Sequence, residues 1–121
     1  MWGNVVDFSE LKGKTFTQVY KTDDCVVFEN ETERYELYHD QDCSEDVRIE
    51  DICGDLINLE DTEITFVEEI SNEGNTNWGT CTWTFYKLGS VKGWVDIRFY
   101  GESNGYYSER VNLHKVEKEE I

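Results

Sequence analysis

Residues 80–86 have the sequence TCTWTFY, in which a threonine takes every second position up to Thr84. The same period of two returns in residues 94–100, WVDIRFY, where the apolar side chains are Val95, Ile97 and Phe99. Successive side chains of a β-strand point to opposite faces, so this period predicts two strands that each bury one face. In the second strand, the buried face is expected to be that of the three apolar residues.

Similar patterns extend from this pair of strands towards both ends of the chain. Alternation, or a short apolar run between polar turns, predicts further strands at residues 15–20, 25–29, 34–39, 47–49, 63–70 and 106–114. The first three of these are expected to form a meander. Residues 88–93 are expected to form a hairpin loop, and Asn104-Gly105 a tight turn, because both of its residues tolerate a positive φ. Longer loops are expected at residues 40–46 and 71–79, and short helical turns at 8–14 and near 52–59.

The composition supports a β-rich chain. It contains no Pro and no Ala, so the best helix-forming residue is missing, while aromatic residues make up 14% of the 121 residues. We therefore expect a mainly β protein: a single small antiparallel sandwich or partly open barrel of about seven or eight short strands with one or two short helical turns. Residues 1–116 would form one domain, and residues 117–121 a charged, frayed tail.

The formal net charge of −16 is unevenly distributed. Residues 21–70 contain 18 acidic and 3 basic residues, which gives −15, whereas residues 71–116 contain 4 acidic and 5 basic residues, which gives +1. Such a charge excludes a protein that binds nucleic acid or an anionic membrane through its overall field. The acidic segment is either an ordinary solubilising surface or a recognition face for a basic partner.

The recognition hypothesis assigns partner binding to an acidic face. Its residues would be Glu36, Asp40, Asp42, Glu45, Asp46, Glu50, Asp51 and Asp55. A compact acidic surface of this kind could occupy a groove of lysine and arginine side chains that otherwise binds phosphate groups.

A second candidate surface lies in residues 83–110, where aromatic rings stand among basic side chains. Aromatic faces, cationic heads and small polar groups are what a nucleotide base and its phosphate require. The proposed ligand-binding residues are Lys87, Lys92, Trp94, Arg98, Tyr100, Ser103, Asn104 and Tyr106. The alternative is that half of these rings face the core and the others support cross-strand pairs.

Signals for catalysis and metal binding are weak. His39, Asp40, Asp42, Cys43, Glu45 and Asp46 lie close together, and Cys53 follows, but paired-cysteine and paired-histidine zinc spacings are absent. We interpret Cys43 and Cys53 as small buried side chains and His39 as a hydrogen-bonded sheet histidine. No nucleophile elbow or phosphate-binding loop is present, so we expect neither an enzyme nor a cofactor or metal site.

The sequence also indicates where the protein is located in the cell. The first residues resemble no signal peptide, and no apolar run approaches the 18 residues of a membrane-spanning helix. We therefore expect a cytoplasmic protein that does not associate with membranes, and whose four cysteines are reduced and buried.

Several stretches resemble an uncharacterised family of small proteins, found mostly in bacteriophages and prophages, that carries a domain of unknown function (DUF7448). They are residues 38–43 (YHDQDC), 49–56 (IEDICGDL), 83–88 (WTFYKL), 91–93 (VKG) and 100–109 (YGESNGYYSE). The resemblance implies a phage or prophage origin and a small accessory role in the cytoplasm of the bacterial host. Where the family often has two adjacent cysteines, this chain has Cys43-Ser44, which argues against a paired-thiol metal site.

Two functional hypotheses follow from these observations. The first is a non-enzymatic phage accessory protein, active in counter-defence, that binds and inhibits a host protein through the acidic face. Its partner would have a basic surface, such as that of a nucleic-acid-binding defence component, without direct contact to nucleic acid. The second is a protein that sequesters a small nucleotide-like signal on the surface of residues 83–110. An enzymatic function would require metal-dependent turnover that is lost on changing His39 or Asp42.

Overall fold

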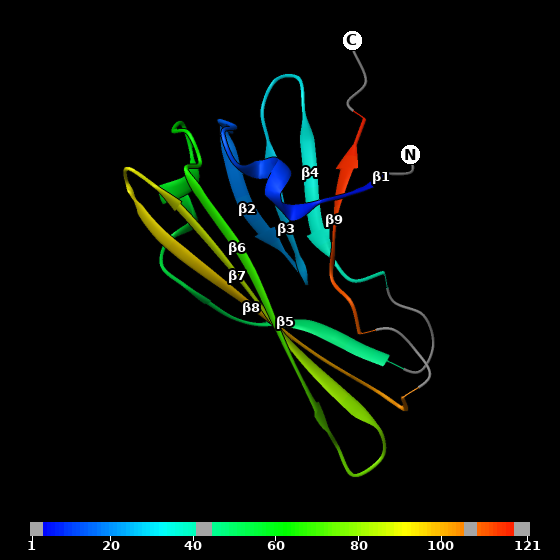
Figure 1. Ribbon diagram of the computed structural model, residues 1–121. Helices are drawn as coiled ribbons and strands as arrows, with labels where there is room; N and C mark the ends of the chain where they lie inside the picture. Colours follow the sequence, from blue (N-terminus) through cyan, green and yellow to red (C-terminus); the bar gives the residue numbers. More distant parts are fainter. Residues whose placement is uncertain (1–3, 41–44, 106–108, 118–121) are drawn as a thin grey trace.

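The computed structural model describes residues 4–40, 45–105 and 109–117. Within these residues the chain forms nine β-strands and two short 3-10 helices. The strands make two antiparallel sheets that face each other across one apolar core (Figure 1). The chain is therefore a mainly β sandwich rather than a closed barrel, which confirms the predicted fold class.

The first sheet contains five strands in the order β1-β9-β4-β3-β2. Their bounds are β1 Asn4–Val6, β2 Gln18–Thr22, β3 Cys25–Glu29, β4 Arg34–Tyr38 and β9 Asn112–Val116. Strands β2, β3 and β4 are neighbours in space as well as in sequence, so they form the predicted meander. Strand β2 begins later than residue 15, because Thr15 and Phe16 make isolated bridges to Glu63 and Glu60 instead.

The second sheet contains four strands in the order β5-β8-β7-β6. Their bounds are β5 Glu45–Cys53, β6 Phe66–Asn75, β7 Thr80–Ser90 and β8 Gly93–Ser103. β7 and β8 pair continuously from Thr80 opposite Ser103 to Ser90 opposite Gly93. The loop is therefore shorter than the predicted residues 88–93, because pairing between β7 and β8 continues until only Val91-Lys92 remain for the turn.

The core lies between the inner faces of the two sheets. Val95, Ile97 and Phe99 are at most 1% exposed, as their alternation predicts. On β7 the inner face carries Tyr86, which is 1% exposed and packs edge-on against Phe99 with ring centroids 5.9 Å apart. The sequence had left open which face of β7 is buried. Because Tyr86 points inward, the odd-numbered residues of β7 point to the opposite side of the sheet.

Two short 3-10 helices add leucine side chains to this core. Helix η1 is Phe8–Leu11 and helix η2 is Leu56–Leu59, close to the two helical turns expected from the sequence. An aspartate caps each helix: Asp7 accepts a hydrogen bond from a backbone N–H of η1 at 3.0 Å, and Asp55 one from η2 at 3.1 Å. The last leucine of each helix is completely buried.

The loop predicted at residues 71–79 is mostly strand. β6 continues to Asn75, and only residues 76–79 turn the chain towards β7. The polar composition of Ser71–Asn75 is compatible with a strand because β6 is an edge strand that pairs with β7 alone. Its polar side chains are mostly exposed, while the ladder with β7 satisfies its backbone on one side.

The hairpin predicted at Asn104-Gly105 is also wrong. Gly105 has a φ of +96°, but the next strand, β9, joins the other sheet, where it lies between β1 and β4. A hairpin with β8 is impossible because β8 is already paired on both sides, with β5 and β7. The crossing instead buries Val111 and Leu113 in the core. The strand predicted at 106–114 is thus replaced by β9, and residues 106–108 lie outside the described ranges.

Candidate functional site

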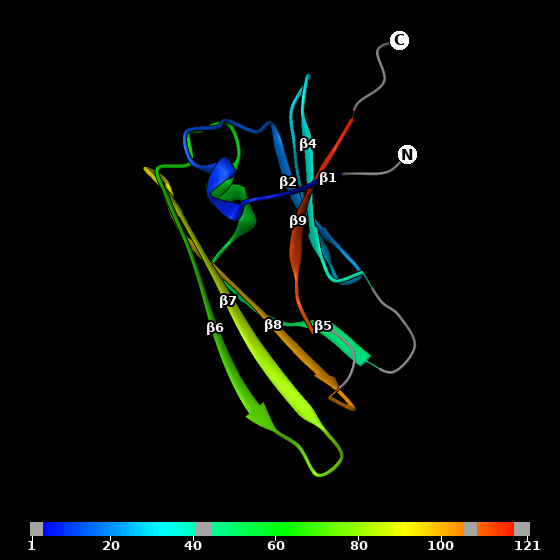
Figure 2. The same ribbon diagram turned by 45° about the vertical axis from the view of Figure 1, so that its right-hand side comes forward.

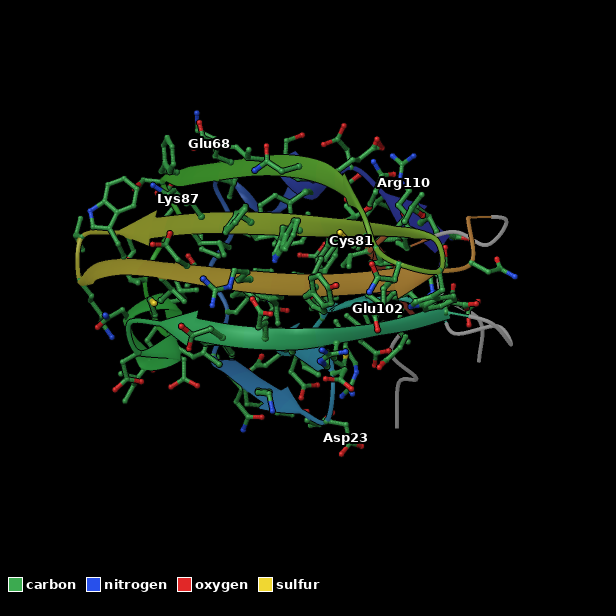
Figure 3. The ribbon with its side chains drawn as sticks, turned by 90° about the horizontal axis from the view of Figure 1, so that it is seen from below. Asp23, Glu68, Cys81, Lys87, Glu102 and Arg110 are labelled. Atoms are coloured by element: carbon green, nitrogen blue, oxygen red, sulfur yellow. The ribbon has the colours of Figure 1, made fainter. Side chains whose placement is uncertain are left out.

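One face of the four-stranded sheet points away from the core, and we call it the outer face (Figure 3). Directly opposite residues of an antiparallel pair share a face, so the register defines its members. They are Asp46, Arg48, Glu50, Asp51 and Cys53 of β5; Phe66, Glu68, Ile70, Asn72 and Gly74 of β6; Cys81, Trp83, Phe85, Lys87 and Gly89 of β7; and Trp94, Asp96, Arg98, Tyr100 and Glu102 of β8.

Large apolar side chains run across the middle of this outer face. Trp83 and Tyr100 lie on neighbouring strands with ring centroids 5.2 Å apart. Ile70 lies opposite Phe85 and is 44% exposed, and Trp94 at the end of the sheet is 58% exposed. Ile70 and the half-exposed rings of Trp83, Phe85 and Tyr100 lie in neighbouring rows over three strands and form a patch, unlike the isolated apolar residues common on protein surfaces. A charged row separates this patch from Trp94: Glu68, Lys87 and Asp96.

Gly89 shapes a second aromatic pair at the end of the outer face. It lies between Phe66 and Trp94 in the register, and the two rings meet across it with centroids 5.0 Å apart. A Cβ atom at Gly89 would lie 3.0 Å from Cε3 of Trp94. The glycine therefore allows the indole to lie against the sheet and contact Phe66.

Charged side chains surround the apolar patch, and its arginines are paired. Arg48 Nη1 lies 2.9 Å from Asp46 Oδ2, and its guanidinium stands 5.2 Å from the centre of the Tyr100 ring. The Tyr100 hydroxyl donates to Glu102 at 2.9 Å, which raises the pKa of Tyr100 to about 12. The guanidinium and the carboxylates thereby hold this ring in place on the outer face.

A β-bulge in β5 sets the position of the other arginine. The register shifts between Ile49 and Asp51, so Glu50 is the extra residue of the bulge. Arg98 Nε lies 2.7 Å from Glu50 Oε1, an ion pair without hydrogen-bond alignment, and Arg98 Nη2 lies 3.9 Å from Asp51 Oδ2. The bulge thus brings two carboxylates to one guanidinium.

The predicted acidic residues do not lie on one face. Glu36 pairs with Arg34 at 2.8 Å on the far side of the five-stranded sheet, while Glu45 is buried against His39 at 3.2 Å. Asp40 is exposed just after β4, and Asp55 caps η2. Asp46, Glu50 and Asp51 do lie together on the outer face. Asp42 lies outside the described residues.

The predicted ligand-binding residues are partly brought together. Lys87, Trp94, Arg98 and Tyr100 share the outer face. Lys92 lies in the β7–β8 turn and donates to the backbone oxygen of Glu60 at 2.7 Å. Ser103 is buried and donates to Glu109 at 2.5 Å, and Asn104 is exposed in the following turn. Tyr106 lies outside the described residues.

The residues considered for a metal are dispersed. His39 is buried and hydrogen-bonded as predicted, with Nδ1 2.6 Å from the backbone oxygen of Arg110 and Nε2 3.2 Å from Glu45, but it lies just after β4 and not within the sheet. Cys53 is exposed at the other end of β5, so the prediction that it is buried is wrong. Asp42 and Cys43 lie outside the described ranges. Among the residues the structure describes, no three His, Cys, Asp or Glu side chains are placed to hold a metal ion.

The apolar members of the outer face were largely missed by sequence reasoning. Phe66, Ile70 and Phe85 were assigned to strands but to no site, since membership of this face depends on the register between β6 and β7. The available signal was the strict alternation of residues 80–86. It sets the odd-numbered residues apart from the threonines but does not tell which set is exposed.

Comparison with known proteins gives one match. A family model described as a domain of unknown function (DUF7448) matches residues 9–113. No curated protein and no solved structure matches the chain. Within the described residues, neither 3-10 helix has the length or apolarity that a membrane span requires.

Proposed function

Given that this chain belongs to the DUF7448 family of domains of unknown function, we propose its function from its surface: it binds another protein through the outer face of the four-stranded sheet. The proposed action is inhibition by occupancy, without catalysis or a cofactor. The observation that carries this proposal is the half-exposed aromatic patch of Trp83, Phe85 and Tyr100, with a second aromatic pair, Phe66 and Trp94, at the end of the same face.

The composition of the outer face resembles that of protein-binding surfaces. Tryptophan, tyrosine and arginine dominate the binding energy of protein interfaces, and they do so at the centre of the contact, where water is excluded. Here Trp83 and Tyr100 occupy the centre, and Arg48 lies against the Tyr100 ring. These side chains are already held by ring contacts and ion pairs, so little side-chain entropy is lost when a partner binds.

The charges of the outer face support a partner with a basic surface. The carboxylates Asp46, Glu50, Asp51, Glu68, Asp96 and Glu102 outnumber the cations Arg48, Lys87 and Arg98 on this face, and both arginines are paired with carboxylates. A partner with exposed lysines and arginines around an apolar centre would complement both the rim and the patch. Of the acidic residues proposed from the sequence for partner binding, this proposal therefore keeps Asp46, Glu50 and Asp51.

We extend the proposal to the biological setting suggested by the resemblance to phage and prophage proteins. The chain would be phage-encoded and would act in the cytoplasm of the bacterial host. The partner would be a host protein with a basic surface, such as a nucleic-acid-binding component of a defence system. Occupancy of that surface by an acidic protein would compete with nucleic acid for the same lysines and arginines.

Affinity capture from a bacterial lysate tests this proposal when it compares three forms of the chain. Trp94→Ser removes an exposed ring of the outer face, whereas Val5→Ser removes a side chain that is 61% exposed on the other sheet. We expect wild type and Val5→Ser to retain the same basic protein, and Trp94→Ser to bind it about 30-fold more weakly, as for a hot-spot residue. The purified pair should also dissociate as salt rises.

Two results would contradict the proposal. One is a captured protein that both variants retain equally, because the contact would then lie elsewhere. The other is a complex with the purified partner that is insensitive to salt. Circular dichroism of each variant checks that the fold is retained.

A nucleotide-like small ligand is the second candidate occupant of this face. The observation in its favour is that Trp94 and Tyr100 share the outer face with Lys87 and Arg98. Thermal-shift measurements with cyclic dinucleotides and ADP-ribose derivatives test it, since a ligand in excess raises stability by RT ln(1 + [L]/Kd). An increase in melting temperature that Trp94→Ser abolishes would favour this candidate, and unchanged melting would exclude these ligands.

A further inference from the structure

A polar pocket of about 580 Å³ lies on the inner side of the four-stranded sheet, away from the outer face. β6 and β7 extend beyond the end of the five-stranded sheet, which leaves the inner face of their hairpin uncovered there (Figures 1 and 2). The pocket lies between this hairpin and residues 109–111, and Arg110 lies beyond the β6 edge in Figure 3. Its volume is within the usual range for small-molecule sites.

Glu109 fixes one wall of the pocket. Its carboxylate accepts hydrogen bonds from the hydroxyls of Thr80 at 2.5 Å, Thr82 at 2.8 Å and Ser103 at 2.5 Å. Burial alone would raise the pKa of Glu109, but these hydrogen bonds lower it below its usual value. The hydroxyl protons are therefore directed towards an ionised carboxylate, and the free lone pairs of the two threonines remain available as acceptors.

Thr84 is a buried polar side chain that the fold does not use. It is 3% exposed, lies on the pocket wall and continues the row of threonines on β7. Among the described residues its hydroxyl has no hydrogen-bond partner, yet its oxygen is not sealed from solvent. Because this oxygen still reaches solvent, a ligand that enters the pocket could hydrogen-bond to it in place of water.

The remaining charges make the pocket acidic. Glu69 and Glu73 of β6 line it, together with Glu109 and a single cation, Arg110. Burial raises the pKa of Glu69, while the charge of Arg110 acts in the opposite direction. Glu69 and Glu73 are four residues apart on a strand, so they are spaced about 13 Å along β6.

We infer that this pocket binds a small organic polycation, namely a linear aliphatic polyamine. Its ammonium groups would donate hydrogen bonds to the Glu69 and Glu73 carboxylates, which are spaced along the β6 edge. Its N–H groups would also supply donors to the threonine oxygens. A neutral sugar would leave the carboxylates without a counter-charge. An anion would be repelled by the three carboxylates of Glu69, Glu73 and Glu109. The inference concerns the opposite side of the sheet from the proposed partner surface and does not rest on it.

Titration calorimetry with spermidine at physiological salt tests this inference. Wild type should bind one spermidine saturably. Glu69→Gln should weaken binding about tenfold or more, because a hydrogen bond to a charged group is lost. Thr84→Val keeps the shape and removes the hydroxyl, so it should weaken binding as well. Both variants should retain the wild-type circular dichroism spectrum.

The control addresses binding caused only by the net charge of the chain. Glu31→Gln makes the same change of charge at an exposed position between β3 and β4 that does not line the pocket, so it should leave the dissociation constant unchanged. Equal weakening by Glu31→Gln and Glu69→Gln would overturn the inference, because attraction would then be non-specific. Non-saturable binding, or binding insensitive to both Glu69→Gln and Thr84→Val, would overturn it too.

Discussion

Replacing Glu109 by glutamine should destabilise the fold more than any change at an exposed carboxylate. Glu109 joins the chain segment that leads into β9 to the ends of β7 and β8, through its hydrogen bonds with Thr80, Thr82 and Ser103. A hydrogen bond to a charged group contributes about 1.5–3 kcal/mol. Glutamine keeps one acceptor oxygen, so part of the network survives. We expect a loss of about 2–4 kcal/mol in the free energy of unfolding at neutral pH.

The pH dependence of this loss follows from the direction of the pKa shift. The pKa of Glu109 is lower in the folded chain than in the unfolded chain. Its contribution is therefore complete above the unfolded pKa and is lost as the pH falls through the folded pKa. The difference in stability between wild type and Glu109→Gln should shrink in acid, whereas an unperturbed carboxylate would give no such trend.

Urea denaturation followed by tryptophan fluorescence measures both quantities. Wild type, Glu109→Gln and the exposed control Glu31→Gln would be compared at pH 7 and at successively lower pH. The control should differ from wild type by less than about 0.5 kcal/mol. A Glu109→Gln loss no larger than that of the control would refute the reasoning. A loss that stays constant as the pH falls would refute the charge-based explanation.

Three further predictions concern the core, a turn and a thiol. Phe28→Ala should lower the free energy of unfolding by about 3–5 kcal/mol in the same urea assay, because Phe28 is fully buried; a loss below about 1 kcal/mol would contradict this packing. Gly79→Ala should destabilise the chain by at least about 1–3 kcal/mol, because a Cβ there would lie 1.9 Å from the backbone oxygen of Ser103; a neutral effect in thermal melts would contradict the close approach. Cys53 is exposed, but its hydrogen bond to Asp51 and the charge of that carboxylate raise its pKa. Alkylation of Cys53 by iodoacetamide at pH 8, measured by mass spectrometry, should therefore be faster in Asp51→Ala than in wild type. An unchanged rate would disprove this cause.

Alternation of apolar and polar residues predicted the strands that bury one face. Residues 94–100 alternate because β8 is one of the two central strands of a sheet with one buried face, so its period is visible in the sequence. The end of β6 has no such pattern, because an edge strand extending beyond the core can carry polar side chains on both faces. The dipeptide Asn104-Gly105 suits a hairpin locally, but pairing of β8 on both sides rules that hairpin out.

The candidate site could be predicted only in part for a related reason. Glu36 and Glu45 are close in sequence, yet one lies on the far side of the five-stranded sheet and the other in the interior beside His39. A run of acidic residues therefore does not define a face once the chain passes between two sheets. Conversely, Ile70 and Phe85 become neighbours only through the register of β6 and β7. Assigning the outer face required both the sheet topology and the register.

Footprinting of the complex by hydroxyl radicals tests the central proposal most directly, because it reports which side chains a partner covers. The reagent oxidises aromatic rings that reach solvent, and both sheets carry exposed or half-buried rings. Binding of the basic partner should reduce oxidation of Trp94, Phe66 and Tyr100 on the outer face and leave Tyr20 of the other sheet unchanged. Unchanged oxidation of Trp94, with protection of Tyr20 instead, would contradict the assignment of the binding surface.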